Sequence, residues 1–220
     1  MNPISIDKNL KQACPEILLS CISCSVIVQA HHDELWKLIH QQCAEIESNL
    51  KTEDIRHNQA IAAARKAYKS CGKDPARYRL SAEALLRRVV SGKGLYQISN
   101  VVDLLNLVSI RTGFSIGGYN ANAIVGNIRM GIGQSDEPYQ GLGRGDLNIE
   151  GMPVFRDEQS AFGTSTSDSV RTGVTPETSH FLMVIVSYEP NQRLNEATQM
   201  AIQLLTDFAN ATDFQTVLIH

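Results

Sequence analysis

The sequence has no apolar run long enough to cross a membrane, which needs about 20 consecutive apolar residues. The longest run, Ile17–Val28, is short and is interrupted by Ser20, Ser23 and Ser25. Residues 1–11 contain no apolar segment behind a basic start, so we expect no signal peptide. The five cysteines are scattered and odd in number. Without an export signal, this pattern predicts reduced thiols and a cytoplasmic protein.

The chain also lacks a strong net charge, because 20 Lys and Arg face 23 Asp and Glu, for a net charge of −3. This balance argues against a wholly basic coat that binds nucleic acid, but it leaves room for a local basic face. The segment Arg65–Lys93 is such a region. Nine Lys or Arg and two Asp or Glu give it a charge of +7, against −10 for the rest of the chain.

The basic segment predicts contacts with RNA phosphates. The alternative is a pair of ordinary solvated helix faces. Arg87 and Arg88 follow a core-facing stripe, so an internal ion pair is a further alternative for one of them. The residues that we predict to contact nucleic acid are Lys69, Lys73, Arg77, Arg79, Arg87 and Arg88.

Apolar residues at helical spacing predict four helices in the first half of the chain. The first covers His32–Leu50 and follows a buried strand over Ile17–Val28. Asp103, in the fourth helix, is placed to return a capping bond to Asn100. Each of the last three begins at a residue that can cap it and stops at a glycine: Thr52 and Gly72, Ser81 and Gly92, Asn100 and Gly113.

The pattern changes after the fourth helix, because ten of the fifteen glycines lie in Gly113–Gly151. Short apolar pieces alternate there with turn residues, which indicates short strands and tight turns. The Ser- and Thr-rich run Gly163–Ser179 is expected to be an exposed loop. We expect a strand over Phe181–Tyr188, a helix over Leu194–Ala209 and a last strand over Thr216–Ile219. Together these elements predict one compact α+β domain, with a strand-rich core and helices from both ends packed on it.

Three segments follow one another in a characteristic order. The first is YKSCGKDPARYRLSAEALLRR, Tyr68–Arg88, and the second is GLYQISNVVDLLNLVSIRTGFSIGGYN, Gly94–Asn120. The third is the strand HFLMVIVSYEP, His180–Pro190, which ends a section rich in Gly, Asp, Ser and Thr. In this order and spacing they resemble the B-three/B-four editing domain of the bacterial phenylalanyl-tRNA synthetase beta chain. The resemblance covers residues 67–190, and we expect residues 1–66 and 191–220 to pack on this core.

The resemblance implies an α+β domain with a pocket for the aminoacyl end of a tRNA. In the synthetase, this pocket hydrolyses tyrosine that is wrongly attached to the phenylalanine tRNA. That reaction needs a dry pocket, hydrogen bonds to the terminal ribose and a positioned water molecule. It needs no protein nucleophile, metal or other cofactor. The expected partner is therefore a tRNA or an aminoacyl-tRNA.

Only one of four family site residues has a clear counterpart in this chain. The family's Thr-Asn pair on the central helix corresponds to Leu105 and Asn106. The family's His corresponds to Gly117, and its Glu on the late strand corresponds to Val184. The resemblance therefore supports the fold more strongly than the editing reaction.

The candidate ligand-binding residues each have two interpretations. Asn106 lies among apolar neighbours, and its amide either touches the substrate or bonds to the nearby glycine-rich turn. Gly117 and Gly118 either let the backbone approach a ligand or form a tight turn. The Ser- and Thr-rich run is either a lid over the pocket or a solvated loop. The predicted substrate-binding residues are Asn106, Gly117, Gly118, Tyr119, Asn120, Thr164 and Ser165.

Two further motifs carry little chemistry. Cys21 and Cys24 form a single CxxC inside a predicted strand, so their side chains point to opposite faces and we expect no metal site. Gly141–Gly145 lacks the strand before it and the helix after it that a nucleotide-binding loop requires.

Two functions remain open. The chain either binds an aminoacyl-tRNA and hydrolyses the wrong ester in trans, or it is a non-catalytic module of the same fold. A non-catalytic module would bind RNA, a small amino-acid-like ligand or a protein partner.

Overall fold

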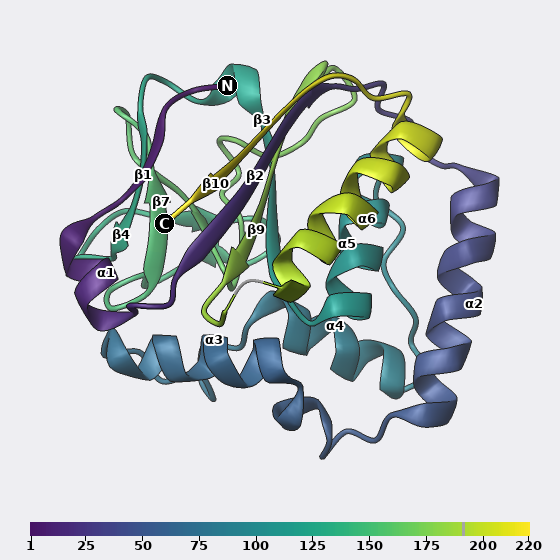
Figure 1. The fold of residues 1–220 in the computed structure, drawn as a ribbon, viewed down its shortest axis with the longest axis horizontal. Helices are drawn as coiled ribbons and strands as arrows, with labels where there is room; N and C mark the ends of the chain where they lie inside the picture. Colours follow the sequence, from purple (N-terminus) through teal and green to yellow (C-terminus); the bar gives the residue numbers. More distant parts are fainter. Residues whose placement is uncertain (191) are drawn as a thin grey trace.

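The computed structural model describes residues 1–190 and 192–220, which form three layers (Figure 1). Two four-stranded sheets pack face to face, and helices cover the outer face of the second sheet. Aromatic rings fill the space between the sheets. The ring centroid of Tyr119 lies 5.0 Å from that of Phe162 and 6.4 Å from that of Phe155. This architecture confirms the predicted α+β class.

The first sheet has the strand order β1-β4-β7-β8. β1 pairs with β4 in parallel, and the other neighbours are antiparallel. A small hairpin, β5–β6, precedes β7 along the chain. The bounds are β1 (Ile4–Ile6), β4 (Ile128–Ile132), β5 (Gln140–Gly141), β6 (Gly145–Asp146), β7 (Pro153–Arg156) and β8 (Ala161–Thr164).

The second sheet is antiparallel throughout and has the order β10-β2-β9-β3. Its two inner strands are the two longest apolar segments of the sequence, which are buried because the first sheet and the helices cover both faces. The strands predicted at these places are confirmed, and the last strand is longer than expected. The bounds are β2 (Leu18–Ser25), β3 (Ser115–Asn120), β9 (His180–Ser187) and β10 (Thr212–Ile219).

Helices α5 and α6 pack on each other and on the second sheet, and α2 and α4 lie outside α5. Helix α3 crosses below the sheets in Figure 1. None of the described helices is long and apolar enough to span a membrane. The bounds are α1 (Lys8–Ala13), α2 (Asp33–Asn49), α3 (Gln59–Ser70), α4 (Ser81–Val90), α5 (Asn100–Thr112) and α6 (Gln192–Ala209), with 3₁₀ turns at η1 (Ile55–His57) and η2 (Ala121–Ala123).

The predicted helices are present, but three of their starts differ from expectation. Thr52 does not cap α3, because Asn58 holds that position and its side chain accepts from the Ile61 N–H at 3.3 Å. Helix α4 has Leu80 at its N-cap, so Ser81 is its first helical residue rather than its cap.

Asn100 was expected to cap α5, and this prediction is wrong because Ser99 is the capping residue. The buried Asn100 amide instead joins three distant segments. It donates to the carbonyl oxygens of Ile27 at 3.0 Å and Phe208 at 2.8 Å, and it accepts from the Gln29 N–H at 2.8 Å. Its role is therefore to fasten α5 to the ends of β2 and α6.

The expectation that the Ser- and Thr-rich run forms an exposed loop is also wrong. The run begins in β8, and short turns satisfy several of its hydroxyl groups internally, although the buried Ser165 Oγ has no partner among the described residues. Thr164 Oγ1 accepts from the N–H groups of Thr166 and Ser167, each at 3.0 Å. A polar run can be buried when its own side chains and backbone supply the hydrogen bonds. The buried members are Thr164, Ser165, Thr166, Ser169, Thr172 and Thr178.

Candidate functional site

A hollow of about 490 Å³ opens beside α4, and we call it the basic hollow. Helix α4 supplies one wall, α5 contributes Asn106, and the turn of the β5–β6 hairpin contributes Arg144. The segment after α4 and the residue Thr166 after β8 complete it. The lining residues are Arg79, Ser81, Ala84, Leu85, Arg87, Arg88, Ser91, Lys93, Tyr96, Asn106, Arg144 and Thr166.

The charge of this hollow has one sign. Five of the lining residues are Lys or Arg, and none of the lining residues described is Asp or Glu. Cations that share a concave wall reinforce one another's field, so the hollow attracts anions more strongly than scattered surface charges would. Three of the six residues predicted to contact nucleic acid, Arg79, Arg87 and Arg88, meet here.

A buried carboxylate below the hollow holds two of these arginines. Glu83 of α4 is 1% exposed and accepts from Arg87 Nε at 3.0 Å. Arg79 Nε lies 3.9 Å from the same oxygen, and Arg65 of α3 donates to the other oxygen at 2.7 Å. This finding confirms the internal ion pair considered for Arg87. One carboxylate facing three guanidinium groups leaves a net positive charge at the wall.

Arg88 is positioned differently from Arg87. Its guanidinium lies 3.7 Å from the ring centroid of Tyr96, which is a close cation–π contact. Its Nε is buried and has no hydrogen-bond partner among the described residues. Because the Nε atom is buried, the contact with the Tyr96 ring, and not a free donor, defines how Arg88 is held in the wall.

Asn106 also has an unpaired side chain. It is half-buried in the wall, and no hydrogen bond from a described residue reaches its amide. The predicted alternative, a bond to a glycine-rich turn, is therefore absent from the described part of the chain. The amide can both donate to and accept from a bound molecule.

The side chains that line the hollow are poorly suited to acid–base chemistry. Its uncharged polar side chains are hydroxyls and one amide, and none of the described lining residues is His, Cys, Asp or Glu. Such a wall can bind an anion and orient a water molecule, but it offers no group that exchanges a proton near neutral pH.

The predicted residues of β3 lie elsewhere, in an edge strand of the second sheet. Gly117 and Gly118 are strand residues and not a tight turn. A Cβ on Gly117 would lie 2.1 Å from the hydroxyl of Tyr119, and a Cβ on Gly163 would also lie 2.1 Å from it. These two glycines leave room for a tyrosine of the chain itself. The N–H of Gly118 is not free for a ligand, because it donates to Asp168 Oδ2 at 3.2 Å.

The structure also locates the positions that the family resemblance assigned to the editing site. Gly117 pairs with Val184 in the sheet, and a Cβ on Gly118 would meet Leu105 at 2.6 Å. The positions that correspond to the family's His and Glu are therefore neighbours. The Tyr119 hydroxyl occupies the space beside Gly117, so this region is filled.

Asn120, Thr164 and Ser165 do not line the basic hollow. Asn120 accepts from the Asn122 N–H at 3.2 Å at the start of η2. The Thr164 hydroxyl accepts a hydrogen bond from the Ser167 N–H within its own turn, and Ser165 is 3% exposed. The sequence missed Thr166, the neighbour that does reach the hollow, because a polar run gives no signal of which hydroxyl faces inward.

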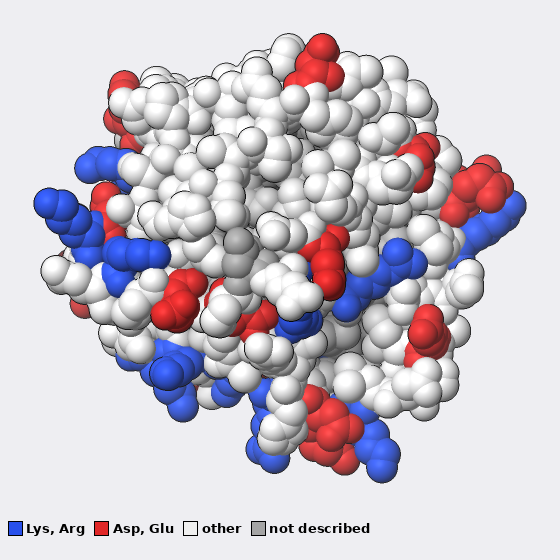
Figure 2. Space-filling view, viewed as in Figure 1, with Lys and Arg blue, Asp and Glu red and all other residues white. Residues whose placement is uncertain are grey.

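The other basic residues that were predicted to contact nucleic acid, Lys69, Lys73 and Arg77, lie outside the hollow. Lys73 is 7% exposed, and its ammonium group donates to the Asn148 carbonyl at 2.9 Å and lies 3.9 Å from the Tyr78 ring centroid. Arg77 lies 5.6 Å from the same ring. Lys69 lines a second hollow of about 330 Å³ on α3, with Arg56, His57, Ala62, Arg65 and Lys66. Lys and Arg project along the lower edge of the face in Figure 2, in the region of α3, whereas the surface over β2, β10 and α6 is largely uncharged.

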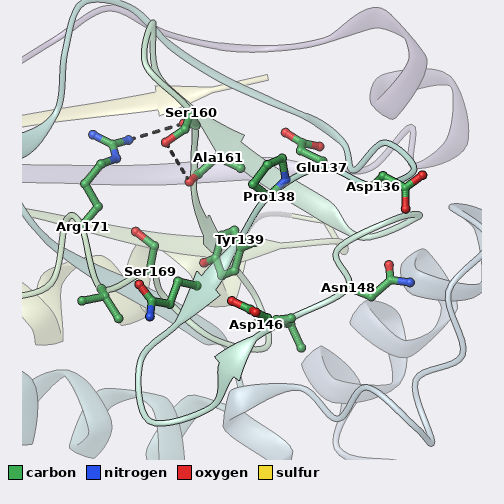
Figure 3. A pocket seen from close by; sticks show the side chains of 13 residues that line it. Asp136, Glu137, Pro138, Tyr139, Asp146, Asn148, Ser160, Ala161, Ser169 and Arg171 are labelled. Carbon is green, nitrogen blue, oxygen red and sulfur yellow. Dashed lines mark hydrogen bonds between the residues drawn. The ribbon is translucent and has the colours of Figure 1, made fainter.

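A third hollow of about 820 Å³ lies beside the β5–β6 hairpin (Figure 3). Two of its four charged lining residues are paired, since Glu137 pairs with Arg156, and Arg171 pairs with Asp157 at 2.9 Å. The other two, Asp136 and Asp146, are acidic, so this hollow does not favour anions. In Figure 3, Arg171 stands at one end and Asp136 at the other. None of the predicted site residues lines this hollow. The basic hollow is therefore the better candidate site.

The chain belongs to the family of B3/4 domains, whose model matches residues 63–210. Its structure is similar to an N-terminal fragment of the phenylalanyl-tRNA synthetase beta-subunit from Pyrococcus horikoshii, with a TM-score of 0.50 and 10% identity. The match covers 99% of this chain and 50% of the fragment, so the chain spans about half of the fragment's length. At this identity the similarity concerns the fold alone. No curated protein matches the sequence.

Proposed function

We propose that this B3/4 domain is a tRNA-binding module whose basic hollow holds phosphates near the aminoacyl end. One observation carries the proposal: five cationic side chains and an unpaired amide line a hollow with no carboxylate among its described lining residues. The family supports the choice of tRNA, because the similar fragment belongs to a tRNA synthetase subunit.

The chemistry of the hollow favours binding over catalysis. Phosphates would neutralise the arginines and Lys93, while Asn106 supplies hydrogen bonds to a ribose or a carbonyl group. Ester hydrolysis in this hollow would depend on a positioned water molecule alone, because none of the described lining side chains can act as a base near neutral pH. The Tyr119 hydroxyl fills the space beside Gly117, the position that corresponds to the family's His, and this further weakens the case for the family's editing reaction.

The test is binding of deacylated tRNA across a salt series. Lys93 and Arg144 line the hollow, are exposed, and have no ion pair with another described residue, so their removal leaves the fold intact. The double variant Lys93→Ala, Arg144→Ala should bind more weakly. It should also lower the slope of log K against log salt by about 0.7–0.9 for each phosphate that the variant no longer neutralises. The double variant Lys8→Ala, Arg129→Ala removes the same charge at exposed positions outside the hollow, and as the control it should keep the wild-type slope.

Absence of tRNA binding at low salt, or binding that does not depend on salt, would refute the proposal. A parallel assay with mischarged aminoacyl-tRNAs measures catalysis. We expect no hydrolysis above that in buffer. Hydrolysis that disappears in Asn106→Ala would instead establish the editing reaction in this hollow.

A further inference from the structure

Two cysteines that are far apart in the sequence meet in the structure. The Sγ atoms of Cys14 and Cys71 lie 3.8 Å apart, although 57 positions separate the residues. Cys14 is the C-cap residue of α1, and Cys71 is the C-cap residue of α3. Both thiols are free, and the side chains are 6% and 9% exposed.

The two thiols differ in their access to solvent. Cys14 lines a hollow of about 230 Å³ whose walls are mainly apolar and include Ala63, Ala67 and Tyr188. Cys71 does not line this hollow and lies behind Cys14. A small molecule that enters the hollow therefore meets Cys14 before Cys71.

The electrostatic setting also separates the two residues. A hydrogen bond from Cys71 lowers the pKa of the Cys14 thiol, and this effect exceeds the opposing effect of burial. The same contact and burial raise the pKa of Cys71. Of the two thiols, Cys14 therefore loses its proton more readily, and the thiolate is the attacking species in thiol chemistry.

We propose that Cys14 and Cys71 form a thiol–disulfide exchange site, in which Cys14 attacks a small disulfide in the hollow and Cys71 resolves the product. In the first step, the Cys14 thiolate bonds to one sulfur of R–S–S–R, the S–S bond breaks, and one RS⁻ leaves. In the second step, Cys71 gives up its proton and attacks Cys14 Sγ, and the second RS⁻ leaves. Both thiolates take up protons, so two cysteines are oxidised and one disulfide is reduced to two thiols.

The product would connect two parts of the fold that otherwise only pack together. Cys14 precedes β2, and Cys71 ends the helix that carries the basic residues Arg65, Lys66 and Lys69. The cross-link closes a loop of 57 positions and so restricts the unfolded chain.

The CxxC pair provides an internal control. Cys21 and Cys24 lie on opposite faces of β2, because three positions along a strand reverse the direction of the side chain. Burial raises the pKa of each thiol to about 12. The CxxC pair, whose spacing is typical of redox sites, is therefore not expected to react. The proposed pair, Cys14 and Cys71, has no such motif in the sequence.

The experiment treats the folded, reduced protein with hydroxyethyl disulfide and maps the cysteines by peptide mass spectrometry. We expect a peptide pair joined through Cys14 and Cys71, with the loss of two hydrogen atoms. The Cys21–Cys24 peptide should stay reduced. The oxidised protein should melt several degrees higher than the reduced protein, because the loop is closed. Absence of the cross-link in the folded protein, or its formation only in denaturant, would overturn the proposal.

The order of attack is tested with single variants. Cys71→Ser should retain mercaptoethanol on Cys14 as a stable mixed disulfide. Cys14→Ser should react at Cys71 at least tenfold more slowly. Cys43→Ser, in α2, should form the cross-link like the wild type. An adduct that forms on Cys71 in the Cys14→Ser protein as fast as the adduct forms on Cys14 in the Cys71→Ser protein would refute the assigned roles. The mapping of the wild type does not depend on whether any variant folds.

Discussion

The carboxylate of Glu83 lies 2.7 Å from Nη1 of Arg65, and this ion pair joins α4 to α3. The other oxygen of Glu83 binds Arg87 at the edge of the basic hollow. A single buried acid therefore both holds two helices together and positions a cation that faces the proposed ligand.

Replacing this acid should destabilise the protein. Breaking a buried ion pair costs about 3–5 kcal/mol. In Glu83→Gln we expect a smaller decrease in the free energy of unfolding, about 1–3 kcal/mol, because partly exposed guanidinium groups remain solvated. Urea unfolding measures the change. Glu34→Gln, which breaks the exposed Glu34–Lys37 pair at 2.7 Å, is the control and should have almost no effect. Equal effects of the two variants would contradict the structural role of Glu83.

Two asparagines of α5 should respond in opposite ways. Asn100→Ala should lower the free energy of unfolding by about 2–4 kcal/mol, because it leaves buried backbone groups without partners. Asn106→Ala should change it by less than about 0.5 kcal/mol and should weaken tRNA binding by about 2- to 10-fold, the value of one hydrogen bond. Unfolding and tRNA titration are measured on the same samples. A large loss of stability in Asn106→Ala would show that its amide has an internal role.

The filled space beside β3 gives a prediction of packing. Gly117→Ala should cost about 1–3 kcal/mol, because the new methyl group meets the Tyr119 hydroxyl. Tyr119→Phe should be neutral or slightly stabilising, since that hydroxyl is buried without a hydrogen-bond partner among the described residues. A double-mutant cycle should show that Gly117→Ala costs less when Tyr119 is Phe. Additive effects in the cycle would contradict the close approach of the two groups.

Asp168 predicts an unusual dependence of stability on pH. Burial raises the pKa of its carboxyl group to about 7, above the value of about 4 in an unfolded chain. Between these values the folded state binds more protons than the unfolded state. The contribution of Asp168 to stability is therefore fully present below about pH 4 and is lost as the pH rises through about 7.

The measurement is urea unfolding at about pH 5 and about pH 8, on either side of the raised pKa, for the wild type and Asp168→Asn. Asn matches the neutral acid and can still accept from the Gly118 N–H. The wild type should lose more stability than the variant between the two pH values. Equal losses would show that Asp168 is ionised throughout this range.

Much of the secondary structure was predictable, because it depends on neighbours in the sequence. The buried strands β2 and β9 are continuous apolar runs, and α5 ends where Gly113 adopts a positive φ of 82°. The failures have a tertiary cause. Asn100 was assigned a local cap, but its amide bonds to Ile27 and Phe208, which are 73 and 108 positions away.

The candidate site was only half predictable. The basic segment contains Arg79, Arg87 and Arg88, which line the hollow together because one helix and its approach carry them. Arg144 gave no signal, because a hairpin turn brings it to α4 from a distant part of the chain. Lys73 had the right charge but points into the protein, which composition does not reveal.

The sequence by itself determined the α+β class, the family and the location of the excess positive charge, because residue order and periodicity carry these properties. Only the tertiary structure decided which cations share a hollow, that Tyr119 fills the space beside Gly117, and that Cys14 meets Cys71. These are contacts between segments distant in the chain. They arise only when two sheets and the helices pack against one another, and no local pattern specifies them.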